Sequence, residues 1–147
     1  MKRDPLIWIL LIAAVIGIIV SAISLNNHYS DKQSFCTISE KINCDVVNKG
    51  PYSELAGIPV ALLGLVGYLV FGLLAFWELE LASFLTFERK DLWPYLALFA
   101  SAMLAFALYL TALETFIIHA WCILCITSQI AVLVLAIGSW AIWHREK

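Results

Sequence analysis

Four cysteines are the residues of this 147-residue chain whose type and spacing could do chemistry. Cys36 and Cys44 lie in the longest polar segment, and Cys122 and Cys125 form a Cys-Ile-Leu-Cys motif in the last apolar stretch. A Cys-x-x-Cys pair near a helix N-terminus has lowered thiol pKa values, because the helix dipole favours the thiolate. The thiolate is the form that attacks a disulfide. The two pairs therefore predict an electron relay from a soluble thiol protein to a lipid-soluble acceptor.

The composition indicates a membrane protein. Hydrophobic residues make up 63% of the chain and charged residues 14%, and the mean hydropathy is +0.91. A soluble domain has about half apolar and about a quarter charged residues, so a bilayer must solvate most of this surface. The net charge of -2 carries no information about nucleic acid as a partner, but the sequence has no basic cluster of the size that such a partner needs.

Four apolar runs are long enough to cross a bilayer, which takes about 20 helical residues. They cover about residues 5–25, 57–77, 92–113 and 117–143. Lipid offers the backbone no other hydrogen-bond partner, so each run predicts a helix. We expect one all-α transmembrane domain over 1–147, a four-helix bundle with a long outer loop over 26–56. Within this loop we expect a short helix around Ser53–Leu55.

The first apolar run also has features of a cleavable signal peptide. Lys2 and Arg3 precede it, and the small residues at 21–24 could form a cleavage site. Its 21 residues exceed the usual apolar region of a signal peptide, about 7–15 residues. The length favours a retained helix.

The distribution of lysine and arginine predicts the orientation, because cytoplasmic segments carry the excess of positive charge. The expected cytoplasmic residues are Lys2, Arg3, Arg89, Lys90, Arg145 and Lys147, and the expected outer ones are Lys32, Lys41 and Lys49. We expect the protein in the plasma membrane, with both termini in the cytoplasm. The outer side carries the 26–56 loop and a short turn over Glu114–His119, so all four cysteines share it. The inner segment over 78–91 is expected to rest at the interface.

Structural use of the cysteines is the plainest alternative. The extracytoplasmic side is oxidising, and four cysteines allow three disulfide connectivities. A bridge suits Cys36 and Cys44 in a loop, whereas Cys122 and Cys125 on a self-bonded membrane helix gain little from one. A four-thiolate zinc site is disfavoured because seven residues separate Cys36 from Cys44, so no metal is expected.

Other cofactors find little support in the sequence. Ile126 rather than histidine follows Cys125, which argues against haem attachment. His28 and His119 lie at span ends and are interpreted as structural or interfacial. A Gly-rich strand–turn–helix unit for flavin or nicotinamide is missing from the sequence. The expected oxidant is therefore a quinone that diffuses in the bilayer, menaquinone or ubiquinone.

Several motifs together resemble those of the vitamin K epoxide reductase family, in its bacterial and archaeal branch. They are Cys36, Cys44-Asp45-Val46-Val47, Ser53, Gly57-Ile58-Pro59-Val60 and Cys122-Ile123-Leu124-Cys125-Ile126-Thr127. The resemblance covers nearly the whole chain. It implies a four-helix bundle around a quinone, with the Cys-x-x-Cys at its outer mouth.

The resemblance also implies a role for each of five residues. Cys125 would face the quinone and form a charge-transfer thiolate. Cys122 would exchange with the loop, through Cys44, and Cys36 would meet the external partner. Ser53 matches a serine or threonine that the family has near its active site.

Two positions depart from the members that reduce vitamin K epoxide. Those members have an asparagine on the second helix and a tyrosine after the Cys-x-x-Cys, where this chain has Val60 and Gln129. Quinone reduction is therefore favoured over epoxide reduction. Gln129 could donate a hydrogen bond to a quinone carbonyl or bond a neighbouring helix. The fused thioredoxin-like domain of many bacterial relatives is absent, so the expected thiol partner is a separate thioredoxin-like protein.

These observations predict a quinone-dependent thiol oxidoreductase that supports disulfide formation outside the cytoplasm. A vitamin K epoxide or quinone reductase in the strict sense is the first alternative. The second bacterial type of quinone-dependent disulfide oxidase has its two cysteine pairs in the reverse order. The remaining alternative is a non-enzymatic four-span protein whose loop is stapled by a disulfide, which would leave the Cys-x-x-Cys unexplained.

Overall fold

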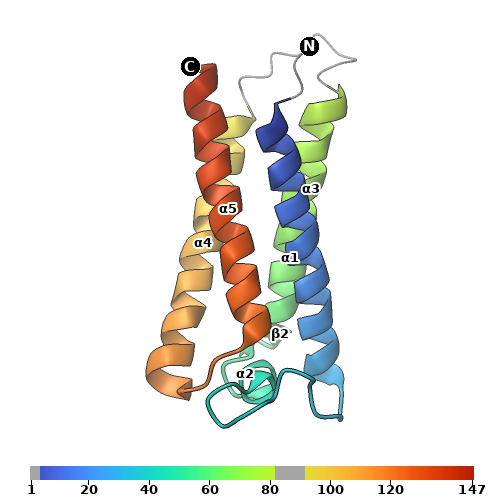
Figure 1. Ribbon diagram of the computed structural model, residues 1–147, viewed down its shortest axis with the longest axis vertical. Helices are drawn as coiled ribbons and strands as arrows, with labels where there is room; N and C mark the ends of the chain where they lie inside the picture. Colours follow the sequence, from blue (N-terminus) through green and yellow to red (C-terminus); the bar gives the residue numbers. More distant parts are fainter. Residues whose placement is uncertain (1–3, 82–91) are drawn as a thin grey trace.

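The computed structural model describes residues 4–81 and 92–147 (Figure 1). Its elements are α1 (Pro5–Tyr29), α2 (Cys44–Lys49), β1 (Glu54–Leu55), β2 (Ile58–Pro59), α3 (Val60–Leu81), α4 (Trp93–Leu113), the π-helical turn η1 (Glu114–Ile118) and α5 (Ile123–Glu146). The two short strands pair antiparallel as a hairpin. The described part is thus an all-α bundle, as the sequence predicts, with one small hairpin that the sequence analysis does not predict.

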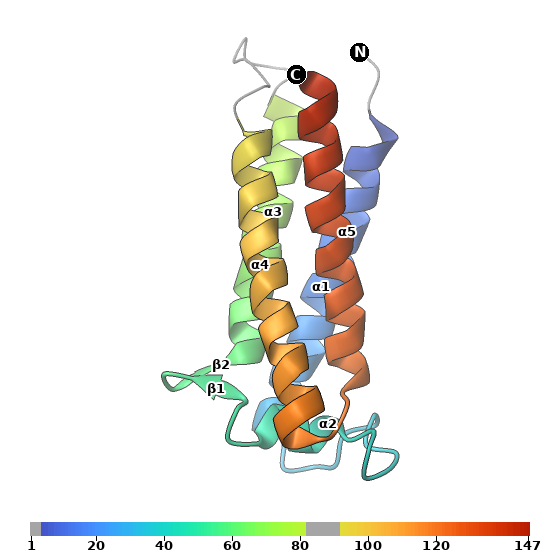
Figure 2. The same ribbon diagram turned by 90° about the vertical axis from the view of Figure 1, so that its left-hand side faces the viewer.

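Four helices of the described part are long and apolar enough to cross a membrane, and their spans are Pro5–Tyr29, Val60–Glu80, Trp93–Ile118 and Ile123–Glu146. They run side by side, with both termini at one end of the bundle and α2 and the hairpin at the other (Figures 1 and 2). We call the second end the loop end. Helix α1 packs against α3 and α5, and α5 packs against α4.

The bundle has an apolar interior and an apolar exterior. Buried side chains along the bundle axis include Leu10, Phe71, Trp93 and Leu135, each at most 1% exposed. Large apolar side chains also cover the outside of the spans, and on α1 these include Ile9, Ile12, Ile16 and Ile19. Such a large apolar surface is unfavourable in water, whereas lipid tails solvate it well.

Small residues and one tyrosine bring the helices together. A Cβ added at Gly17 of α1 would collide with the ring of Tyr68 on α3, so only glycine allows this approach. The Tyr68 hydroxyl donates to the Ser128 carbonyl on α5 at 2.7 Å. Three of the four spans are therefore joined near one level of the bundle.

The structure corrects the expected loop boundaries. The second span starts at Val60, and Gly57 (φ 81°) lies in the turn of the hairpin rather than in a helix. The short helix covers Cys44–Lys49, not Ser53–Leu55. The Asn43 side chain caps it by accepting from the amide of Val46 at 3.1 Å, which satisfies one of the unpaired amides at a helix start.

The expected turn over Glu114–His119 is also wrong in its first part. Helix α4 continues through the π-helical turn to Ile118, and the chain reverses from His119, whose backbone is left-handed (φ 55°). The last helix begins at Ile123, so Cys122 precedes it and Cys125 lies in its first turn. The predicted fourth span over 117–143 therefore starts too early in the sequence. The expected cytoplasmic residues Lys2, Arg3, Arg89 and Lys90, and residues 82–91 of the inner segment, lie outside the described residues.

Candidate active site

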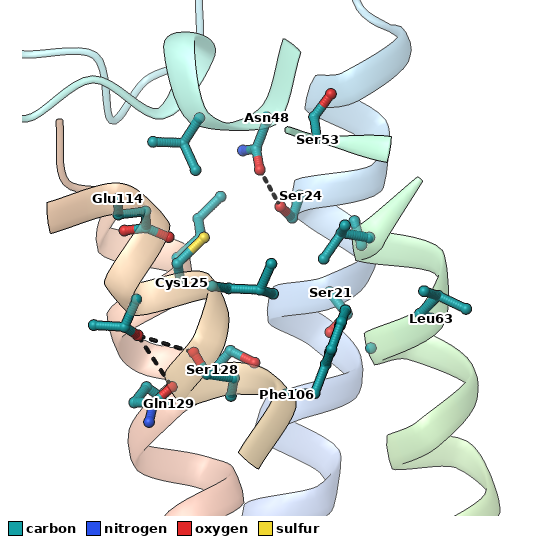
Figure 3. Close-up of a pocket in the computed structure, with 18 of the residues that line it drawn as sticks. Ser21, Ser24, Asn48, Ser53, Leu63, Phe106, Glu114, Cys125, Ser128 and Gln129 are labelled. Atoms are coloured by element: carbon teal, nitrogen blue, oxygen red, sulfur yellow. Dashed lines mark hydrogen bonds between the residues drawn. The ribbon is translucent and has the colours of Figure 1, made fainter. Parts of the chain in front are cut away.

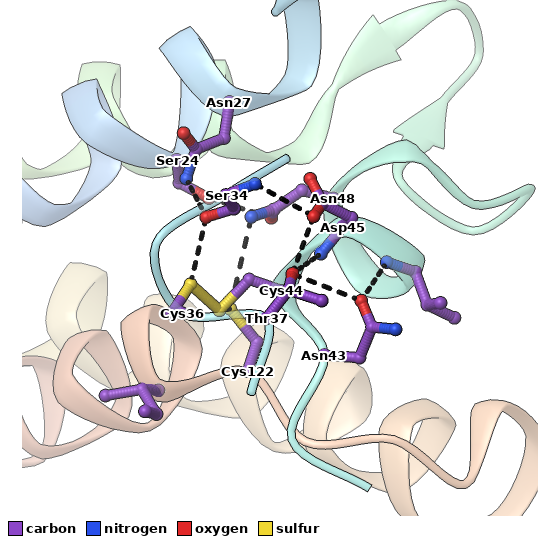
Figure 4. The surroundings of a disulfide bond; sticks show 12 residues. Ser24, Asn27, Ser34, Cys36, Thr37, Asn43, Cys44, Asp45, Asn48 and Cys122 are labelled. Atoms are coloured by element: carbon purple, nitrogen blue, oxygen red, sulfur yellow. Dashed lines mark hydrogen bonds between the residues drawn. A yellow bond between two sulfur atoms is a disulfide. The ribbon is translucent and has the colours of Figure 1, made fainter. Parts of the chain in front are cut away.

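The loop end holds a disulfide between Cys36 and Cys44, whose Cα atoms are 5.7 Å apart (Figure 4). Cys44 is the first residue of α2, and Cys36 lies in the turn that precedes it. The hydroxyl of Ser34 contacts the Cys36 sulfur at 3.2 Å and accepts a hydrogen bond from the Asn27 amide of α1 at 2.9 Å. Helix α1 is thereby linked to the disulfide.

Asp45 holds the turn around Cys36 in place. Its carboxylate accepts from the Thr37 hydroxyl at 2.6 Å and from the Ser34 amide at 2.9 Å, and it pairs with Lys49 at 3.0 Å. Burial by itself would raise the pKa of Asp45, but the hydrogen bonds from Thr37 and Ser34 and the charge of Lys49 outweigh it and lower the pKa. The carboxylate therefore stays charged and keeps the turn closed.

A backbone bridge joins the loop to the segment before α5. Ile42 and Trp121 form a parallel β-bridge, in which the Asn43 amide donates to the Trp121 carbonyl at 3.0 Å and the Trp121 amide donates to the Lys41 carbonyl at 2.7 Å. The residues that follow Ile42 and Trp121 are thus held side by side. They include Cys44 in the loop segment and Cys122 in the segment before α5.

The Cys122 thiol lies 3.3 Å from the Cys44 sulfur of the disulfide. Cys122 and Cys125 are both free thiols in this structure. Cys36, Cys44 and Cys122 are each at most 1% exposed. A thiol in contact with a disulfide in a water-excluded site is the arrangement from which exchange proceeds. The expected pairs are therefore brought together at one end of the bundle.

Four effects set the acidity of Cys122. The interaction with the Cys125 thiol is the largest and lowers the pKa of Cys122, burial and the charge of Glu114 oppose it, and amides in the first turn of α5 lower it further. The net result is a lowered pKa for this thiol, as a helix N-terminus predicts. The lowered pKa increases the fraction of Cys122 that is present as thiolate, the form that takes part in thiol–disulfide exchange.

Asn48 is a residue of the site that the sequence reasoning missed. Its amide points at the Cys122 sulfur at 4.0 Å, and its side-chain oxygen accepts from the Ser24 hydroxyl of α1 at 2.8 Å. It follows Cys44 by one helical turn, so both face the same side of α2. Had the short helix been assigned to 44–49, this spacing would have identified it.

We call the group of Cys36, Cys44 and Cys122, together with the neighbouring Cys125, the sulfur centre. A cavity between the helices reaches this centre at Cys125 (Figure 3). Its volume is about 160 Å³, whereas one buried water needs only roughly 10–15 Å³. The lining is largely apolar, as in sites for ring-shaped ligands. Cys125 and three further residues predicted from the sequence, Ser53, Val60 and Gln129, all line it. A quinone ring therefore fits the chemistry of this cavity.

Two of these residues have partners within the protein. The Thr111 hydroxyl of α4 donates to the Gln129 side-chain oxygen at 3.4 Å, which is the helix–helix bond considered from the sequence. The Ser53 hydroxyl donates to the Gly50 carbonyl at 2.6 Å. Val60 offers the cavity an apolar side chain at the start of α3. The Gln129 amide nitrogen and the Ser53 hydroxyl oxygen keep capacity for a further hydrogen bond.

Glu114 is a second residue that the sequence reasoning missed as part of the site. It was interpreted as flanking a span, but α4 and the π-helical turn form one span through Ile118. Its carboxyl is 4% exposed, lines the cavity and contacts the Cys125 thiol and the Cys122 backbone. An acidic residue inside a membrane span is a signal of function. Extending the third helix by one turn would have made this signal visible.

A family comparison agrees with this geometry. The model of the vitamin K epoxide reductase family matches residues 8–140, nearly the whole chain. The chain belongs to the vitamin K epoxide reductase family. Membership in this family implies a thiol/quinone oxidoreductase, and the motifs that resembled it in the sequence lie around the sulfur centre and the cavity.

The sulfur atoms of Cys36, Cys44 and Cys122 lie within 4.8 Å of one another, close enough to hold a metal ion. Two of them share a disulfide in this structure and cannot act as thiolate ligands. The same spacing also meets the distance requirement of thiol–disulfide exchange.

Proposed function

We propose that this protein passes electrons from an extracytoplasmic thioredoxin-like protein to a membrane quinone. The partner reduces the Cys36–Cys44 disulfide, and the loop pair then reduces a Cys122–Cys125 disulfide. A quinone, menaquinone or ubiquinone, finally reoxidises Cys122 and Cys125. The net reaction supplies oxidising equivalents for disulfide formation in exported proteins.

The contact of 3.3 Å between the Cys44 and Cys122 sulfurs is the observation that carries this proposal. In the forward direction the Cys44 thiolate attacks the Cys122 sulfur and Cys125 leaves. Cys36 then attacks Cys44, which restores the loop disulfide and frees the Cys122 thiol. The structure, with the loop pair oxidised and Cys122 and Cys125 free, corresponds to the state after this step.

The cavity supports the second half of the reaction. Two thiols lose two electrons and two protons as the Cys122–Cys125 bond forms, and the quinone takes them up to become the quinol. Cys125 lines the cavity and can meet the ring, with Ser53 and Gln129 as candidate hydrogen-bonding partners. Val60 supplies no hydrogen bond where epoxide-reducing members have an asparagine, which favours a quinone over an epoxide as substrate.

The orientation and the partner complete the proposal. We place the loop end outside the cytoplasm and both termini inside, as the lysine and arginine distribution predicts. The oxidising side then holds both cysteine pairs. Cys36 is the sulfur assigned to the partner, and because it is only 1% exposed the turn around it must open during that encounter.

Purified protein tests this function. Dithiothreitol and a short-chain menaquinone or ubiquinone are added, and quinone absorbance is followed over time. Cys122→Ala and Cys125→Ala should each abolish quinone reduction, because either change removes a sulfur of the final pair. Cys36→Ala is the matched control, which should keep reduction by dithiothreitol but lose the oxidation of a protein dithiol. Full activity in the Cys125→Ala protein would refute the assignment.

A further inference from the structure

Glu114 is a buried carboxyl group in a membrane span for which the relay described above has no use. It is 4% exposed and begins the π-helical turn at the loop end of α4. Removing such a group from water is costly, and acidic residues persist inside membranes where they bind ions or carry protons. Its position therefore needs an explanation from function.

Glu114 lies next to the groups that would react in the proposed relay. Its carboxyl contacts the Cys125 thiol and the backbone of Cys122, and Figure 3 shows Glu114 and Cys125 together at one end of the cavity. Both residues line the cavity. The carboxyl thus borders the same cavity as the sulfur that would meet the quinone, and lies beside that sulfur.

A π-helical turn begins at Glu114. One extra residue in the turn shifts the register of the side chains that follow, and such single turns recur at functional sites. The Glu114 amide remains within the helix by donating to the carbonyls of Leu110 and Thr111. The backbone is thereby satisfied, and the carboxyl is left for the sulfur centre.

We propose that Glu114 is a catalytic residue that transfers protons from the Cys122/Cys125 dithiol to the quinone oxygens. The proposal rests on the proposed function, because it needs the quinone in this cavity. The carboxylate takes the proton of the Cys125 thiol and gives it to a quinone oxygen. The two thiols lie three residues apart at the start of α5 and interact, so the Cys122 proton reaches the carboxylate through the Cys125 sulfur and follows the same route. One S–S bond forms, two electrons and two protons reach the quinone, and Glu114 ends as the carboxylate from which it began.

The test is the Glu114→Gln variant, which keeps the size and polarity of the side chain but cannot carry a proton. The kcat of quinone reduction by dithiothreitol should fall about 100-fold, the loss typical of a missing general acid–base. The KM for the short-chain menaquinone should not change. Glu40→Gln makes the same chemical change at an exposed loop position that does not line the cavity, and should keep the wild-type rate.

A second readout separates proton transfer from structural support. With Cys36 and Cys125 replaced by alanine, the Cys44–Cys122 mixed disulfide can be trapped, and adding Glu114→Gln should leave its yield unchanged. A damaged loop end would lower that yield. If the amide prevents folding, Glu114→Leu removes the buried polar group altogether and should show the same loss of kcat.

The outcomes are distinct. A wild-type protein that reduces no quinone overturns the proposed function itself. A wild-type protein that is active, with a Glu114→Gln or Glu114→Leu variant at the same kcat, overturns the role of Glu114 alone. A kcat loss accompanied by an equal loss of mixed disulfide also overturns it, because the defect would then be structural.

Discussion

The sulfur of Cys122 lies 3.3 Å from the sulfur of Cys44, a residue 78 positions earlier in the chain. Helix α2 supplies one sulfur and the residue before α5 supplies the other. Cys36 completes a group of three sulfurs within 4.8 Å. Of the two thiols in the Cys-x-x-Cys motif, Cys122 is the one positioned for exchange with the loop, and Cys125 is left to the cavity.

The first prediction concerns this selectivity. A Cys36→Ala/Cys125→Ala protein should accumulate a Cys44–Cys122 mixed disulfide under mild oxidation, because the two remaining sulfurs are in contact and nothing resolves the bond. The Cys36→Ala/Cys122→Ala protein is the matched control, which retains Cys44 and Cys125. Non-reducing peptide mapping should find far less cross-link in it. Equal yields in the two proteins would contradict the assignment of Cys122 as the exchanging thiol.

The second prediction concerns Asn48. Replacing it with leucine removes the side-chain donor facing the Cys122 sulfur and leaves the Ser24 hydroxyl without its acceptor. A hydrogen bond to a charged group contributes about 1.5–3 kcal/mol, so the rate of Cys44–Cys122 exchange should fall roughly tenfold or more. Stopped-flow quenching followed by alkylation measures that rate. Ser24→Ala, which leaves the Asn48 amide in place, should have a smaller effect, and the reverse order would count against a direct contact.

The third prediction concerns pH and the turn that covers Cys36. The pKa of Asp45 is lowered in the folded protein, so its contribution to loop stability is present above the ordinary value of 3.8 and lost as the pH falls through the lower folded value. Protection factors of the Ser34 amide against hydrogen exchange should therefore stay constant from neutral pH to about pH 4 and drop below it. Asp45→Asn should lower this protection already at pH 7. An unchanged protection factor in that variant would show that Asp45 does not hold the turn.

The fourth prediction concerns packing between α1 and α3. Gly17→Ala places a methyl group against the Tyr68 ring and should destabilise the bundle by about 1–3 kcal/mol, as overpacking does. Gly72→Ala is the control, because its new methyl group would lie at an ordinary 3.6 Å from Ala14. Thermal unfolding midpoints in detergent compare the two. Equal midpoints would mean that the Tyr68 ring moves aside without cost.

Hydropathy alone predicts the bundle because lipid imposes one backbone solution on each apolar run. The predicted spans overlap all four observed ones, and the family resemblance is confirmed over residues 8–140. The structure of the loop end was harder to predict, because it is set by contacts between segments that are distant in the sequence. The helix at Cys44–Lys49 is only six residues long. The reversal at His119 depends on a left-handed backbone conformation, which residues other than glycine adopt only uncommonly. Both errors hid a functional neighbour, Asn48 in the first case and Glu114 in the second.

The bridge between Ile42 and Trp121 has a consequence for how this enzyme family can vary. The alignment of Cys44 with Cys122 is carried there by main-chain amides and carbonyls, which every residue except proline possesses in full. Substitutions at 41, 42 and 121 can therefore change the side chains at this surface while the main-chain bonds keep the two sulfurs aligned. In the proposed relay, the choice of redox partner and the internal electron transfer would then be separately adjustable.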